Sequence, residues 1–119
     1  MHSASLVFAG IVAALHLFFL TLEMFLWEKP LGLKTFRNTP EKAALTAVLA
    51  KNQGLYNGFL SAGLIWGLVH PDAAVAVQLL RFFFGCVIVA GAYGAATVSP
   101  RIFLIQGVPA LIGLGLTFA

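Results

Sequence analysis

Two ionisable side chains in the first apolar stretch of the chain, His16 and Glu23, are the residues best suited to acid–base chemistry. They are seven residues apart, so in a helix they share one face about two turns apart. Ionisable groups inside a bilayer are costly and by default indicate function, and a buried carboxyl must be paired or protonated. Both residues are therefore candidate catalytic acids or bases. The alternative is that polar neighbours satisfy each of them and that both only stabilise the fold.

A second group of polar residues lies in later apolar stretches. Four of them, between positions 52 and 57, fall at i, i+1, i+4 and i+5 and share one face of a helix. If successive stretches cross a bilayer in alternating directions, Tyr93 and Gln106 reach nearly the depth of Glu23, whose nearest partners by depth are Asn52 and Tyr93. The alternative is a network of interhelical hydrogen bonds, worth ~0.6–2 kcal/mol each, that only fixes the helices. The candidate ligand-binding residues are His16, Glu23, Asn52, Tyr56, Asn57, Tyr93 and Gln106.

Metal chemistry is not predicted. His16 and Glu23 supply only two ligands, while His2 and His70 lie toward the opposite membrane face. A single cysteine, Cys86, excludes both an internal disulfide and a thiolate zinc cluster. No cofactor can therefore be inferred from these residues.

Composition indicates the environment of these side chains. Hydrophobic residues make up 61% of the 119 residues and charged residues only 9%, whereas a soluble domain carries ~25% charged residues. Because so few charges cannot coat a water-facing surface, an ordinary soluble globule and a disordered chain are both excluded. The net charge of +3 comes with no basic face interleaved with aromatic residues, so nucleic acid is not an expected partner.

Four stretches are apolar enough to be membrane spans, since ~20 apolar residues cross ~30 Å of hydrocarbon. We therefore predict an all-α fold, in which residues 1–119 form one membrane domain, a compact bundle of four transmembrane helices. The first stretch lacks the basic start of a signal peptide and is longer than its usual apolar run of ~7–15 residues, which favours a retained span. The predicted spans cover approximately residues 4–27, 48–69, 74–98 and 102–119.

Proline and capping residues predict where helices begin. A Thr-Pro-Glu run at residues 39–41 predicts that the second helix starts near Pro40, before the bilayer. His-Pro-Asp at residues 70–72 predicts a tight turn that ends the second helix and begins the third, and Ser-Pro at residues 99–100 predicts the start of the last helix. Pro109 lies inside that helix, where it cannot donate a backbone hydrogen bond and crowds the carbonyl of Ile105. A kink or a freed carbonyl is therefore expected there.

The distribution of basic residues predicts the orientation, because cytoplasmic loops are enriched in Lys and Arg. The first connection is basic and the third contains Arg101, so both are placed in the cytoplasm and both termini outside. Arg81 falls in the outer half of the third span, where snorkelling to the outer interface explains it without a function. The basic residues of the first connection are Lys29, Lys34, Arg37, Lys42 and Lys51.

Small residues recur at the spacing that lets helix backbones approach each other in lipid. Two GxxxG motifs occur, at Gly54/Gly58 and at Gly63/Gly67, and the third span has similar pairs of small residues between positions 90 and 95. These faces favour packing within the chain, with a homodimer through a GxxxG face as the alternative.

Three blocks of the sequence have a distinctive pattern. They are HLFFLTLEMFLW from His16, KNQGLYNGFLSAGLIWGL from Lys51 and GCVIVAGAYGAATVSPRI from Gly85. Together they resemble the domain-of-unknown-function 1304 family. The resemblance implies a small, multi-pass protein of the bacterial cytoplasmic (inner) membrane, and it implies no reaction.

The residues favour a membrane protein that holds a hydrophobic, lipid-like or quinone-like ligand at a polar site toward the cytoplasmic half of the bilayer. Acid–base chemistry at His16 or Glu23 would make it an enzyme, a question that the sequence leaves open. One alternative is a proton-coupled exporter, similar in size and span count to the small multidrug resistance transporters but with a long basic first connection and different motifs. The other alternative is a purely structural or interaction role.

Overall fold

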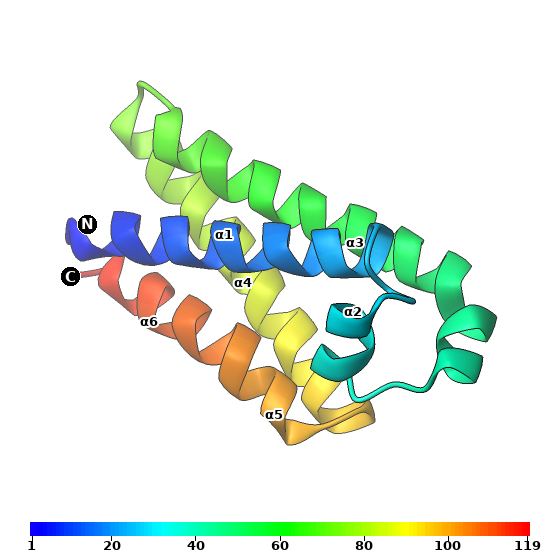
Figure 1. The fold of residues 1–119 in the computed structure, drawn as a ribbon. Helices are drawn as coiled ribbons and strands as arrows, with labels where there is room; N and C mark the ends of the chain where they lie inside the picture. Colours follow the sequence, from blue (N-terminus) through cyan, green and yellow to red (C-terminus); the bar gives the residue numbers. More distant parts are fainter. The chain divides into compact units, whose positions relative to one another are not determined.

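The computed structural model describes residues 1–119 and contains helices joined by short turns (Figure 1). The prediction of an all-α fold is confirmed. The elements are α1 (Ala4–Met24), α2 (Pro30–Thr35), α3 (Pro40–Val69), α4 (Ala73–Thr97), α5 (Pro100–Ile102), the π-helical segment η1 (Phe103–Gly107) and α6 (Val108–Leu116).

Three of the predicted helix starts are confirmed, each with its capping side chain. The hydroxyl of Thr39 accepts a hydrogen bond from the backbone N–H of Lys42 at 3.2 Å, and α3 begins at Pro40. The carboxylate of Asp72 accepts from two N–H groups in the first turn of α4. Ser99 caps α5 in the same way. These side chains satisfy N–H groups that have no partner within their own helix.

The irregularity expected around Pro109 takes the form of a π-helical segment. Pro109 is the second residue of α6, and η1 occupies the five residues from Phe103 to Gly107 just before it. Proline lacks an N–H and crowds the carbonyl four residues earlier. A π turn inserts an extra residue into the helix, so the chain passes this point without ending the helix.

Two helices are long and apolar enough to cross a membrane, α1 and α4. Only 33% of the apolar stretch of α1 and 22% of that of α4 are buried, so most of their residues are half-buried or exposed. Helix α3 has 30 residues, but its polar cluster from position 51 to 57 lowers its apolarity. The segment Pro100–Leu116 is apolar but shorter than a full span.

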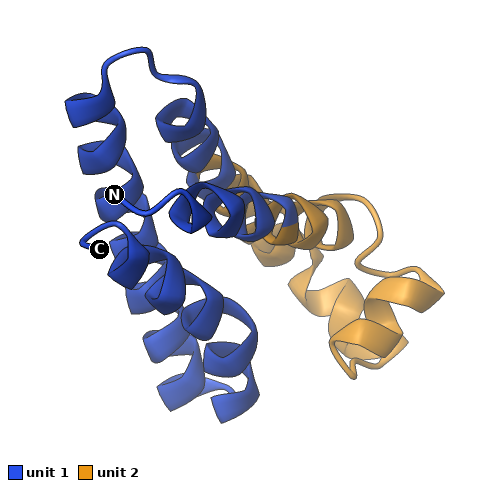
Figure 2. Ribbon diagram, turned by 90° about the vertical axis from the view of Figure 1, so that its left-hand side faces the viewer, with its two compact units in different colours: residues 1–14, 60–119 blue, residues 15–59 orange.

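The chain divides into two compact units (Figure 2). Unit 1 comprises Met1–Ala14 and Leu60–Ala119, and unit 2 comprises Leu15–Phe59. Both α1 and α3 are continuous helices that contribute one part to each unit.

Two aromatic rings of α4 pack against glycines in and beside the apolar core of unit 1. A Cβ added to Gly113 would lie 2.5 Å from the ring of Phe84, and one added to Gly63 would lie 2.3 Å from the ring of Phe83. Because each glycine leaves room for a ring, the helices can approach while the ring fills the space between them. The buried core residues are Ala9, Val12, Ala13, Leu64, Leu80, Phe84, Val87 and Ala110.

Unit 1 also holds both ends of the chain, which lie close together in Figure 1. The backbone N–H of His2 donates to the carbonyl of Leu116 at 2.9 Å. Half-buried Arg81 donates from Nε to the hydroxyl of Thr117 at 3.1 Å and from Nη2 to its carbonyl at 3.0 Å. Its guanidinium also lies 3.8 Å from the centroid of the Phe118 ring. Arg81 therefore binds the end of α6, an arrangement that snorkelling alone does not describe.

Candidate functional site

Glu23 occupies the last turn of α1, which ends at Met24. Its side chain is only 2% exposed, and its Oε1 accepts a hydrogen bond from Nδ2 of Asn57 on α3. Asn57 is itself 8% exposed. Glu23 thus faces the interior of unit 2 and meets a polar residue of α3, and this residue is Asn57 in place of the Asn52 or Tyr93 expected from depth.

The exposed side chain of Gln53 also interacts with the Glu23 carboxyl. It lies one turn before Asn57 on α3, so the two amides approach the same carboxyl from one helix face. The sequence places Gln53 on the polar face, but the predicted site leaves it out. The signal in the sequence that could have added Gln53 to the predicted site is its position four residues before Asn57, on the same helix face.

A glycine brings the two helices together at this level. A Cβ added to Gly54 would lie 3.1 Å from Cβ of Glu23, 2.6 Å from Cγ of Met24 and 3.3 Å from the backbone carbonyl oxygen of Leu20. One added to Gly58 would lie 2.7 Å from Cδ1 of Leu20. The first GxxxG motif therefore packs α3 against α1 within the chain.

The buried side chains of α3 form a stripe at the spacing i, i+4, i+7 and i+11. The stripe consists of four buried residues, Ala50, Gly54, Asn57 and Ser61. Three of them, the alanine, the glycine and the serine, have side chains too short to reach far across to a neighbouring helix. Asn57 is thus the one long polar side chain in the stripe, and its length allows it to reach Glu23. In unit 1 the hydroxyl of Ser61 donates to the carbonyl of Ala13 on α1 at 2.8 Å.

Asn52 differs from the prediction that made it a nearest partner of Glu23. It is exposed, and its Nδ2 donates to the carbonyl of Val48 on its own helix at 2.9 Å. Tyr56 is 58% exposed and packs its ring 6.0 Å from that of Phe59. The predicted polar face is therefore divided, because only Asn57 is buried against Glu23, whereas Asn52, Gln53 and Tyr56 are exposed.

His16 is fully buried on the same face of α1 as Glu23, seven residues earlier. That spacing separates the two residues by roughly 10 Å along the helix. The imidazole ring packs edge-on against Phe19, with 5.8 Å between ring centroids.

The two remaining predicted residues belong to unit 1. Tyr93 on α4 is 72% exposed, and its backbone carbonyl accepts a hydrogen bond from the hydroxyl of Thr97. Gln106 is half-buried in η1, where its Cβ lies 3.5 Å from the position of a Cβ added to Gly91. Close packing of α4 on η1 at Gly91 thus fixes the backbone around Gln106.

The contact in unit 2 supplies one carboxyl group and two amides. One carboxyl oxygen is held by an amide N–H, which fixes the orientation of the group. Such a group can accept a hydrogen bond from a ligand, donate one when protonated, or transfer a proton. No three His, Cys, Asp or Glu side chains of the chain come together as a metal site.

Comparison with known proteins places the sequence of this chain in a family. Residues 10–118 match the model of the family described as a protein of unknown function (DUF1304). The chain is also 29% identical over 111 residues to a protein of Lactococcus lactis subsp. lactis (strain IL1403) named as uncharacterized protein YpaA, with 91% of this chain and 92% of that protein covered. No solved structure matches the chain. Because the family model covers nearly the whole sequence, the chain belongs to the DUF1304 family of proteins of unknown function.

Proposed function

We propose that this protein is a four-span protein of the bacterial cytoplasmic membrane that holds a hydrophobic or lipid-like molecule through the carboxyl group of Glu23. The observation that carries the proposal is the burial of this carboxyl against Asn57 beside apolar helices. A buried carboxyl is costly unless it is paired or protonated, and it marks a functional site in apolar surroundings.

The outward-facing apolar surface supports the membrane part of the proposal. The core helix of a soluble protein is mostly buried, whereas only a minority of the residues in the apolar stretches of α1 and α4 are buried. Helix α3 and the continuous segment Pro100–Leu116 supply the other two spans in this arrangement. Basic residues between α1 and α3 put that connection in the cytoplasm and both termini outside.

Cysteine labelling tests the topology. Cys86 is first replaced by Ser, so that a single introduced cysteine reports its own position. An impermeant maleimide added to intact cells should label a His70→Cys variant and spare a Lys34→Cys variant. Labelling of Lys34→Cys from outside would overturn the orientation.

The apolar surroundings of a few polar groups support the ligand part. Binding sites for small molecules are mostly apolar with a few polar groups that fix orientation. Around Glu23 these polar groups are the amides of Gln53 and Asn57, and His16 lies on the same face of α1. A hydroxyl or carbonyl on an otherwise hydrophobic molecule suits this set.

Native mass spectrometry of protein purified in mild detergent tests the ligand. The wild-type protein should retain a hydrophobic molecule, and Glu23→Gln should retain less of it while folding normally, because Gln keeps the shape but cannot ionise. Asn52→Ala is the matched control, since Asn52 is exposed on the same helix. Equal ligand content in all three proteins would leave the polar contact as a purely structural feature.

The carboxyl group of Glu23 would also suit a proton-coupled exporter. Measuring substrate flux in vesicles distinguishes this function from ligand holding. A pH gradient should drive substrate flux in vesicles only if the protein is an exporter, and Glu23→Gln should abolish that flux. The ligand-holding function predicts no flux with the molecule that copurifies.

A further inference from the structure

The connection between α1 and α3 in unit 2 is a folded structure and contains the short helix α2. Gly32 packs so closely on the preceding turn that an added Cβ would lie 2.0 Å from the carbonyl oxygen of Leu26. A side chain at this position would therefore collide with backbone. The close approach holds α2 against the end of α1.

Trp27 joins this connection to the start of α3. Its indole N–H lies 3.1 Å from the carbonyl oxygen of Ala43 and 3.2 Å from the hydroxyl of Thr46, and both accept hydrogen bonds from it. The ring of Phe36 packs on the indole, with 5.0 Å between centroids. The connection is thus fixed at both ends before any partner binds.

Arg37 has a backbone conformation that is unusual for its residue type. Its φ of 51° is the only positive φ outside glycine in the chain. This left-handed conformation favours Gly or Asn, and a long side chain there raises the energy of the backbone. The backbone N–H of Asn38 donates to the carbonyl of Leu33 at 2.8 Å and closes the turn around Arg37. The turn therefore presents a guanidinium where a glycine would be more stable.

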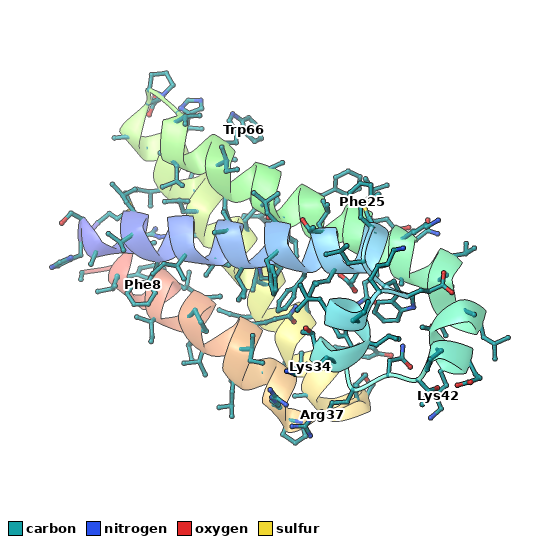
Figure 3. The ribbon with its side chains drawn as sticks, in the orientation of Figure 1. Phe8, Phe25, Lys34, Arg37, Lys42 and Trp66 are labelled. Atoms are coloured by element: carbon teal, nitrogen blue, oxygen red, sulfur yellow. The ribbon has the colours of Figure 1, made fainter.

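Further exposed cations lie along this connection, before and after Arg37. Figure 3 labels Lys34, Arg37 and Lys42 around α2 and the start of α3, and all three are exposed. Lys29 precedes α2 and is exposed as well. Only two acidic residues, Glu28 and Glu41, lie between positions 28 and 42, so the connection has a net positive charge. Leu31 adds an apolar side chain, 49% exposed, among these cations.

We infer that this preformed basic connection, residues 29–42, binds the phosphate headgroups of anionic phospholipids in the leaflet that it faces. The inference rests on the membrane insertion proposed above. Charge complementarity identifies the partner, because juxtamembrane clusters of Lys and Arg are attracted to anionic leaflets. A guanidinium pairs with a phosphate through two parallel hydrogen bonds, which a fixed loop makes at little cost in conformational freedom. The exposed Leu31 suits the acyl boundary just beneath the headgroups.

The turn at Arg37 allows a test in which backbone strain and lipid binding change in opposite directions. Arg37→Gly relieves the left-handed backbone and removes one charge. Its melting temperature in a neutral detergent should rise by a few degrees. Its affinity for phosphatidylglycerol in mixed micelles should fall roughly fivefold, the share of one basic residue near an anionic surface.

Two further variants complete the experiment. Arg37→Lys keeps the charge and the strain but loses the two parallel hydrogen bonds, so its affinity for phosphatidylglycerol should lie between those of the wild type and Arg37→Gly, without the gain in melting temperature. A Lys34→Gln, Arg37→Gln, Lys42→Gln triple variant should lose the preference for phosphatidylglycerol over phosphatidylcholine. The wild-type preference should weaken in high salt, which screens charges at the surface.

Alkaline carbonate washing of membranes separates this inference from the proposed function. Every variant should stay in the membrane fraction. Release of the wild-type protein from the membrane would overturn both proposals. A wild-type protein that stays in the membrane but responds equally to phosphatidylglycerol and phosphatidylcholine would overturn lipid binding alone. An Arg37→Gly variant that is stabilised and keeps wild-type lipid affinity would likewise show that the guanidinium is not a headgroup ligand.

Discussion

Glycines bring helices together in both compact units, but the groups that pack against them differ. In unit 1, Gly63 and Gly113 face aromatic rings, and the contact is apolar. In unit 2, Gly54 faces Cβ of Glu23 and the backbone of α1, and the contact encloses a carboxyl and an amide. The same residue type at similar spacing therefore produces an apolar core in one unit and a buried polar pair in the other.

The difference shows what each unit can tolerate. The packing of an aromatic ring against a glycine depends on shape, and removing the ring leaves a cavity. The polar pair depends on both partners, because either one alone is a buried group without its hydrogen bond. Function is more readily assigned to unit 2, since its buried carboxyl costs stability that an apolar residue would not.

The largest effect is expected from Phe84→Ala in unit 1. Phe84 is fully buried against Gly113, so the truncation should lower the free energy of unfolding in detergent by about 3–5 kcal/mol. Phe82→Ala is the control on the same helix, because Phe82 is 65% exposed, and it should change stability by less than about 0.5 kcal/mol. Equal losses would show that exposed rings contribute to stability as much as the core.

A four-protein cycle tests the polar pair. Asn57→Leu should destabilise by about 1–3 kcal/mol, because the Glu23 carboxyl loses a donor. Adding Glu23→Leu should restore most of the loss, since replacing both partners by apolar groups is nearly neutral. Chemical unfolding of the wild type, the two single variants and the double variant gives the coupling. Additive losses would mean that the two side chains do not depend on each other.

A smaller effect is expected at Arg81. Its hydrogen bonds to Thr117 and its contact with the Phe118 ring should together be worth about 1–2 kcal/mol, so Arg81→Met should lower stability by that amount. Methionine keeps most of the apolar stem, so the loss reports the guanidinium. If Arg81 only snorkels to the interface, thermal unfolding of Arg81→Met and wild type will coincide.

The smallest effect is expected from Asn52→Ala. Asn52 is exposed and donates only to its own helix, so stability should change by less than about 0.5 kcal/mol. Unfolding in detergent measures the loss of stability of Asn52→Ala, and the loss is compared with that of Asn57→Leu. A loss as large as that of Asn57→Leu would mean that burial on α3 does not separate the two asparagines.

Local signals in the sequence predict the helices well. Pro40, Asp72 and Ser99 act at the positions where the backbone begins a helix, because capping and the fixed φ of proline are local effects. Helix α2 was missed, since its six residues are stabilised by the contact of Gly32 with Leu26 and not by a pattern of their own.

The polar site was predicted in part. Depth follows from counting residues along a helix, and it correctly brought Glu23 to the level of the polar cluster on α3. Direction around the helix does not follow from depth: at roughly 100° per residue, Asn57 lies about 60° from Gly54, whereas Asn52 lies about 160° away. The small-residue stripe identifies the contacting face, and applying it would have selected Asn57 over Asn52 as the partner of Glu23.

The sequence by itself determined that the chain is helical, where its long helices begin, and that an acid sits in an apolar stretch, because composition, capping and periodicity act over a few residues. Only the tertiary structure decided that Glu23 meets Asn57 and Gln53, that Arg81 binds the end of α6, and that Arg37 takes a left-handed turn. Each of these depends on where another segment lies, and a distant contact leaves no local pattern.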